Sequence, residues 1–142
     1  MSNSQFAQSV KAVVTSVTQP LWTWSGVCFG YRRDASLFTY DGVEVGRFVG
    51  AEVYGVDGSY LGEVRRTENG GGDRLITSNY KKSRTAPAFP PIMERPHLRD
   101  ASRAAEPLYC GYEEFPSPEI LKAAVFDLRK RLKSFAAANP IQ

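Results

Sequence analysis

The sequence predicts a mainly β protein with three to four pseudo-symmetric β-hairpin repeats, flanked by an N-terminal and a C-terminal α-helix. Three segments of equal length align with one another: 21–32 (LWTWSGVCFGYR), 37–48 (LFTYDGVEVGRF) and 53–64 (VYGVDGSYLGEV). Six glycines form two series that recur every 16 residues: 26, 42 and 58, then 30, 46 and 62. Apolar residues at both ends of the chain have the spacing of amphipathic helices, which predicts the flanking elements.

The N-terminal segment 1–20 is predicted to be a helix that ends at Pro20. One apolar stripe carries this prediction, formed by Phe6, Val10, Val13, Val14 and Val17. Residues 1–9 lack Lys and Arg, and residues 10–19 lack a continuous apolar run, so no secretory signal is predicted. We therefore expect a cytoplasmic protein, and no apolar stretch is long enough for a membrane span.

The repeat domain is assigned to residues 21–82. In each unit the first position is aliphatic, the second is aromatic and the ninth is apolar. Asp41-Gly42 and Asp57-Gly58 separate apolar runs, which predicts tight two-residue turns of type I′. The second glycine of each unit falls in the returning strand, where it indicates a crowded axis or an overlying aromatic ring.

A degenerate fourth unit is assigned to residues 73–82, where LITSN resembles LFTYD of the second unit. This segment lacks the glycine pair and lies off the 16-residue period. We therefore expect it to act as a closing strand, because three or four hairpins can close a sheet and remove its edges.

The rest of the chain divides into a basic, Pro-rich linker at 83–107 and a C-terminal part at 108–142. The C-terminal part begins with a short apolar strip and continues as an amphipathic helix. Ser117 is the expected N-cap and Pro118 the first helical residue. The helix presents an apolar seam with alternating spacings of four and three residues, formed by Leu121, Val125, Leu128, Leu132 and Phe135.

The motifs FTYDGVEVGRF, VYGVDGSYLGEV and DRLIT are followed by the basic run SNYKKS and, after the Pro-rich segment, by YCGYEEFPSPE. On these motifs the chain resembles the bacterial 4-fold beta flower family over roughly residues 21–118. The resemblance implies four hairpin petals around a pseudo-fourfold axis. It implies no established activity and no catalytic residue.

Composition and motifs argue against several classes of site. The chain has 142 residues and a net charge of +3, which does not by itself indicate a nucleic-acid partner. Its two cysteines, Cys28 and Cys110, form no CxxC pair, and His97 is the single histidine, so no zinc site is predicted. Cofactor and phosphate-binding motifs are also absent, and we expect no cofactor. Cys28 with His97 is a candidate nucleophile and base. The equivalent positions in the other units, Glu44 and Tyr60, favour instead a solvent-side or lightly packed thiol at Cys28.

Aromatic and basic residues form the candidate ligand or interaction surface. The aromatic residues of the repeats make either a core layer or an exposed platform for stacking. Residues 65–103 contain nine Lys or Arg against four Asp or Glu, which is either a solvated stretch or a basic rim. The candidate surface comprises Trp22, Trp24, Tyr40, Tyr60, Arg65, Arg66, Arg74, Lys81 and Lys82.

The sequence favours a non-enzymatic binding or protein-interaction module with an unknown target. Its partner is an unknown protein or a second copy bound through the C-terminal helix. One alternative is an accessory protein that binds nucleic acid through the aromatic and basic surface. A second alternative is an enzyme with a site of unrecognised type.

Overall fold

The computed structural model describes residues 18–67 and 72–138. Most of the predicted N-terminal helix at 1–20 lies outside this part of the chain, and its described end is not helical, because Gln19 and Pro20 begin strand β1. Seven strands and a short strand precede one long helix. Their bounds are β1 (Gln19–Thr23), β2 (Cys28–Arg33), β3 (Ser36–Thr39), β4 (Glu44–Val49), β5 (Glu52–Gly55), β6 (Tyr60–Arg66), β7 (Asp73–Ser78), the 3₁₀ helix η1 (Asn79–Lys81), β8 (Tyr112–Glu114) and α2 (Pro118–Ala138).

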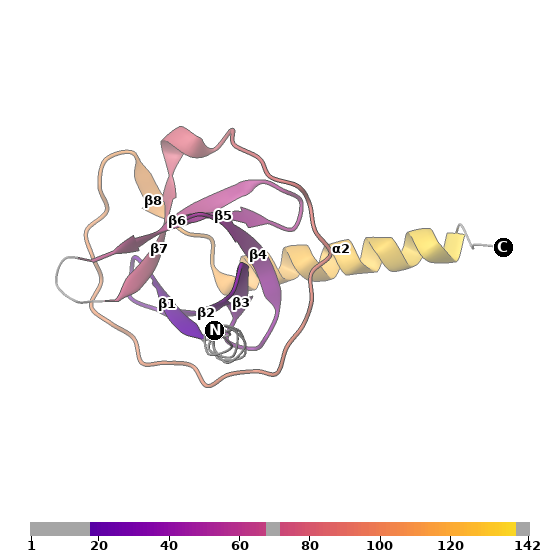
Figure 1. The fold of residues 1–142 in the computed structure, drawn as a ribbon, viewed down its shortest axis with the longest axis horizontal. Helices are drawn as coiled ribbons and strands as arrows, with labels where there is room; N and C mark the ends of the chain where they lie inside the picture. The colour runs from indigo at the N-terminus through magenta and orange to yellow at the C-terminus, as the bar shows by residue number, and fades with distance from the viewer. Residues whose placement is uncertain (1–17, 68–71, 139–142) are drawn as a thin grey trace, which may run out of the picture.

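Strands β1 to β7 form a closed barrel (Figure 1). Each strand pairs antiparallel with the next, and β1 and β7 close the ring as a parallel pair through Trp22 and Arg74. Closure leaves these seven strands without a long exposed edge. The predicted mainly β class is confirmed.

The three hairpin loops close by a turn that differs from the predicted one. In the second hairpin the amide of Gly42 donates to the Thr39 carbonyl at 2.9 Å, and the amide of Thr39 in turn donates to the Val43 carbonyl at 2.9 Å. A type I′ turn needs positive φ at both central residues, but Asp41 does not have it, whereas Gly42 has φ +86°. The type I′ prediction is therefore wrong. The loops are three-residue turns that end on a left-handed glycine.

The second glycine series lies at a register shift in each hairpin. Leu37 pairs with Gly46 while its neighbour Phe38 pairs with Glu44, so Val45 is left as the extra residue of a bulge. The same shift follows the pairs that contain Gly30 and Gly62. These glycines are crowded, as predicted. A Cβ on Gly62 would lie 2.5 Å from the Phe115 ring.

The interior of the barrel is apolar and continues into the base of α2. Its buried members include Leu21, Phe29, Leu37, Val53 and Leu75 from the strands. Phe115, Leu121 and Val125 enter the same cluster from the C-terminal part, so the first half of α2 covers one mouth of the barrel. The second half of α2 extends beyond the barrel (Figure 1).

The segment assigned as a fourth unit contributes one strand rather than a hairpin. Strand β7 pairs with β6 along one side and with β1 along the other. Residues 79–81 form η1, so the returning strand is missing at this point in the chain. Its place beside the end of β7 is taken by β8, where Ile76 pairs with Glu114.

Residues 83–111, which we call the belt, wrap around the outside of the barrel (Figure 1). The sequence suggested a linker over most of this segment, but the segment is bound to each hairpin loop in turn. Six belt amides donate to loop carbonyls at 2.7–3.1 Å. The pairs are Ala86 to Gly58, Phe89 to Val56, Glu94 to Gly42, His97 to Tyr40, Arg103 to Gly26 and Glu106 to Trp24.

The belt approaches the loops so closely that the loop glycines have no room for a side chain. A Cβ on Gly42 would lie 2.2 Å from the carbonyl oxygen of Glu94. At Gly26 and Gly58 the corresponding distances to belt carbonyl oxygens are 1.9 Å and 2.1 Å. Glycine is therefore needed at these positions for its positive φ and also for the contact with the belt.

Candidate functional site

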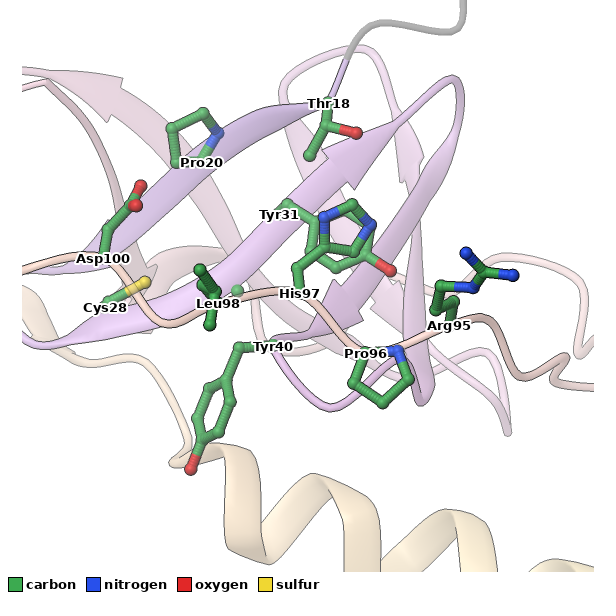
Figure 2. Close-up of a pocket in the computed structure, with 11 residues that line it drawn as sticks. Thr18, Pro20, Cys28, Tyr31, Tyr40, Arg95, Pro96, His97, Leu98 and Asp100 are labelled. Carbon is green, nitrogen blue, oxygen red and sulfur yellow. The ribbon is translucent and has the colours of Figure 1, made fainter.

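A pocket of about 480 Å³ lies between the outer face of the barrel and the belt (Figure 2). Strands β1 and β2 supply one wall, and belt residues 95–100 supply the other. We call it the belt pocket. Its lining residues are Thr18, Pro20, Cys28, Gly30, Tyr31, Tyr40, Arg95, Pro96, His97, Leu98 and Asp100.

Tyr31 is the buried aromatic floor of this pocket. Its ring stacks on Phe38 with 5.2 Å between centroids, and the His97 ring tilts against it at 4.3 Å. Its hydroxyl donates to Oε2 of Glu94 at 3.0 Å. Burial and this acidic partner raise the pKa of the phenol well above its ordinary value, so Tyr31 stays protonated at neutral pH.

Arg33 joins the floor of the pocket to the belt. Its guanidinium pairs with Glu94 at 2.7 Å, and a second nitrogen lies 3.3 Å from Nε2 of His97. Because a guanidinium can donate but not accept, Nε2 of His97 must be the acceptor. The ring proton is therefore placed on Nδ1 of His97. The His97 residue itself lines the pocket.

Cys28 and His97 both line the pocket, but the arrangement does not activate the thiol. Burial raises the pKa of Cys28, which keeps the sulfur in the protonated form that is a poor nucleophile. The imidazole of His97 is committed to Arg33 and to the Tyr31 ring. The sequence favoured a solvent-side or lightly packed thiol, whereas Cys28 is buried beneath the belt.

Most aromatic members of the predicted surface are buried. Trp22, Trp24 and Tyr60 are all less than 10% exposed, so they are not available as a stacking platform. The two indole N–H groups donate to belt carbonyls at 2.9 Å, Trp22 to Ala101 and Trp24 to Pro107. These side chains therefore form a layer between the barrel and the belt, and Tyr40 is the half-buried member that reaches the pocket.

The basic members of the predicted surface lie among acidic partners. Arg65 contacts Glu63 at 3.0 Å, and Lys81 contacts Glu63 at 2.8 Å. The remaining exposed members are also paired, Arg66 with Asp73 and Lys82 with Glu113.

Arg74 is buried and donates to the Trp24 carbonyl. The structure therefore does not assemble the nine predicted residues into one exposed basic and aromatic surface, and the nucleic-acid hypothesis loses the feature that motivated it.

Sequence reasoning missed the floor residue of the belt pocket, Tyr31, and the pair Arg33 and Glu94 that contacts it. Tyr31, Arg33 and Glu94 come from β2 and from the belt, which are far apart in the chain. One signal was present: in the repeat alignment Tyr31 stands where the other units have Arg47 and Glu63. An aromatic residue at a position that is charged in its counterparts marks a local difference in environment.

Other types of site find no support in the described part of the chain. Within residues 18–67 and 72–138 there is no group of three or more His, Cys, Asp or Glu side chains that could hold a metal ion. The same residues include no helix that is long and apolar enough to cross a membrane. Comparisons with family models, with curated proteins and with solved structures found no match to this chain.

Proposed function

We propose that this protein is a non-enzymatic binding module whose belt pocket takes a small, flat, largely apolar molecule with one or two hydrogen-bonding groups. The observation that carries the proposal is the pocket itself, about 480 Å³ between the barrel wall and the belt. Binding sites for small molecules commonly have this size and combine an apolar lining with a few convergent polar groups.

The lining of the pocket supports this class of ligand. The half-buried Tyr40, together with Pro20 and Leu98, offers apolar surface, and the buried Tyr31 closes the floor. Polar groups come from both walls, among them the hydroxyl of Thr18 and the imidazole of His97. Leu98 is 95% exposed at the mouth, where a bound molecule would remove it from water.

The chemistry of the pocket favours binding over catalysis. Cys28 and Tyr31 are the groups there with shifted pKa values, and both shifts are upward. Both groups therefore remain neutral near pH 7, whereas a nucleophile or general base needs the deprotonated form.

Ligand-observed NMR with indole, benzamide and phenylacetate as probes tests this proposal. We expect saturation transfer to at least one probe from the wild-type protein. The variant Leu98→Asp should reduce it, because a charge at the mouth opposes entry of an apolar molecule. Val49→Asp is the matched control, since Val49 is also exposed and lies outside the pocket lining. Transfer to none of the probes at millimolar concentration, or equal loss in both variants, would contradict the proposal.

We also propose that the three hairpins are copies of one unit, as in the 4-fold beta flower family. The support is geometric. Each hairpin has a register shift next to the second glycine, a three-residue loop and a loop glycine against the belt. Replacing the loop 40–42 (YDG) by the third-unit loop 56–58 (VDG) amounts to the single substitution Tyr40→Val. It should preserve folding if the units are equivalent. A failure of this exchange to fold would oppose the proposal.

A further inference from the structure

The outer half of α2 carries an apolar seam that continues past the barrel. Leu121 and Val125 are buried at the barrel mouth, whereas Leu132 is 54% exposed. Leu132 lies seven residues after Val125 and four after Leu128, so all three side chains share one face of the helix. Because Leu121 and Val125 pack in the barrel cluster, the exposed part of the seam faces the same side of the helix as the barrel.

A groove of about 190 Å³ borders this seam where α2 meets the barrel. Val45, Val56 and Leu61 line it from the barrel, and Leu128 is shared between the groove and the seam. On the other side of the helix, Arg129 reaches the belt and contacts the sulfur of Met93 at 3.1 Å. The seam thus starts in an inner corner between the barrel and the helix.

The groove itself is lined by Asp57 and Asp127 as well as Arg131, but the charges around the seam beyond it are positive. Residues 128–138 (LRKRLKSFAAA) contain four Lys or Arg and no Asp or Glu. Arg129 and Arg131 follow Leu128 and precede Leu132, so they fall on opposite flanks of the seam. Asp127 pairs with Arg131 at 3.1 Å, but both side chains are more than 60% exposed, so this pair holds Arg131 only weakly.

We propose that this corner, formed by the groove and the exposed seam, docks an acidic amphipathic helical segment of a partner protein. The apolar side chains of the partner would cover Leu128 and Leu132, and its carboxylates would meet Arg129 and Arg131. Helices in grooves bind through apolar positions at this spacing, with charged flanks that determine which partner is accepted.

Two other occupants fit the same observations less well. A second copy of this helix would bring Arg129 and Arg131 against like charges, which opposes self-association. A flat membrane cannot lie along a seam that faces the barrel side, because the barrel occupies the inside of the corner. A helix about 10 Å across fits such a corner.

The test uses two synthetic 21-residue peptides with identical leucine seams, one flanked by Glu and the other by Lys. Fluorescence anisotropy with the full chain should show binding of the Glu peptide that weakens as salt is raised, and at least about tenfold weaker binding of the Lys peptide. Leu132→Ser should weaken binding of the Glu peptide about tenfold without changing the melting temperature, because the side chain is exposed.

A matched pair of variants separates the effect of a charge beside the seam from the effect of net charge. Arg131→Gln and Lys130→Gln each remove one positive charge, but Lys130 lies on the face opposite the seam. Arg131→Gln should weaken binding of the Glu peptide, and Lys130→Gln should leave it nearly unchanged.

Several results would overturn the proposal. These are equal binding of the two peptides, binding of neither, or equal effects of the two charge variants. Binding to vesicles of phosphatidylcholine and phosphatidylglycerol without binding of the Glu peptide would favour a membrane surface instead. A dimer in light scattering that Leu132→Ser abolishes would favour a second copy. None of these outcomes depends on the belt pocket, so the two proposals fail independently.

Discussion

Replacement of Gly42 by alanine measures how strongly the belt is joined to the barrel. Gly42 has φ +86°, and a Cβ there would lie 2.2 Å from the Glu94 carbonyl oxygen. Gly50 is the matched control, because it also has a positive φ, +63°, and a Cβ there would meet nothing within 4 Å. The left-handed backbone costs a non-glycine residue about 1–2 kcal/mol, and this cost applies to both variants.

The additional cost at Gly42 comes from the belt. Ordinary contact requires roughly 1 Å more separation between the new Cβ and the Glu94 oxygen. That movement strains or breaks the hydrogen bond from the Glu94 amide to Gly42, which is 2.7 Å long. Overpacking costs about 1–3 kcal/mol, and a lost hydrogen bond costs about 0.5–1.5 kcal/mol. Gly42→Ala should therefore destabilise the fold by about 2–4 kcal/mol more than Gly50→Ala does.

Urea unfolding followed by tryptophan fluorescence gives the free energy of unfolding of each variant. Equal m-values would indicate that the two variants have comparable denatured states. If the two variants lose the same stability, the close contact between the belt and the loop does not exist in solution.

Three further predictions concern the barrel mouth and the thiols. Leu121→Ala should destabilise the protein by about 2–5 kcal/mol in the same urea assay, because the side chain is buried where α2 covers the barrel; no loss would mean that α2 is not docked there. Burial opposes ionisation of Asp41, but hydrogen bonds from Lys122 and Thr39 outweigh it and lower its pKa. The stability from this interaction is therefore present above the unfolded pKa of Asp41, near 4, and is lost as the pH falls through the folded pKa. The difference in free energy of unfolding between wild type and Lys122→Gln should therefore shrink below about pH 4. A thiol-reactive dye should label the exposed Cys110 quickly and the buried Cys28 slowly until the protein is unfolded, and equal rates would contradict the burial of Cys28.

The barrel strands were the part of the fold most accessible from sequence. The 16-residue glycine spacing and the alternation of apolar residues predict hairpins, since both have a direct geometric cause in strand pairing. The turn type was wrong because Asp-Gly suits more than one kind of loop. Its conformation here is set by the three residues 40–42 and by the belt contact at Gly42.

The belt was not accessible from sequence. Its binding to the barrel depends on backbone amides such as those of Glu94 and His97. Backbone hydrogen bonds do not require a regular spacing of apolar and polar side chains, so the sequence shows no pattern for them. The prolines of the segment oppose regular secondary structure, but they do not show what the chain lies against. For the same reason the burial of Trp22 and Trp24 was undecided, because their cover comes from the belt.

Amide hydrogen exchange of the folded protein, resolved by NMR, tests the belt most directly. The six belt amides that donate to loop carbonyls should exchange far more slowly than an unprotected chain. Neighbouring belt amides that donate no hydrogen bond should exchange quickly, which would give protection spaced along the belt at the three loops. The six amides to measure are those of Ala86, Phe89, Glu94, His97, Arg103 and Glu106. Uniformly fast exchange from 83 to 111 would show that this segment is a free linker, and the belt pocket would then lose one of its two walls.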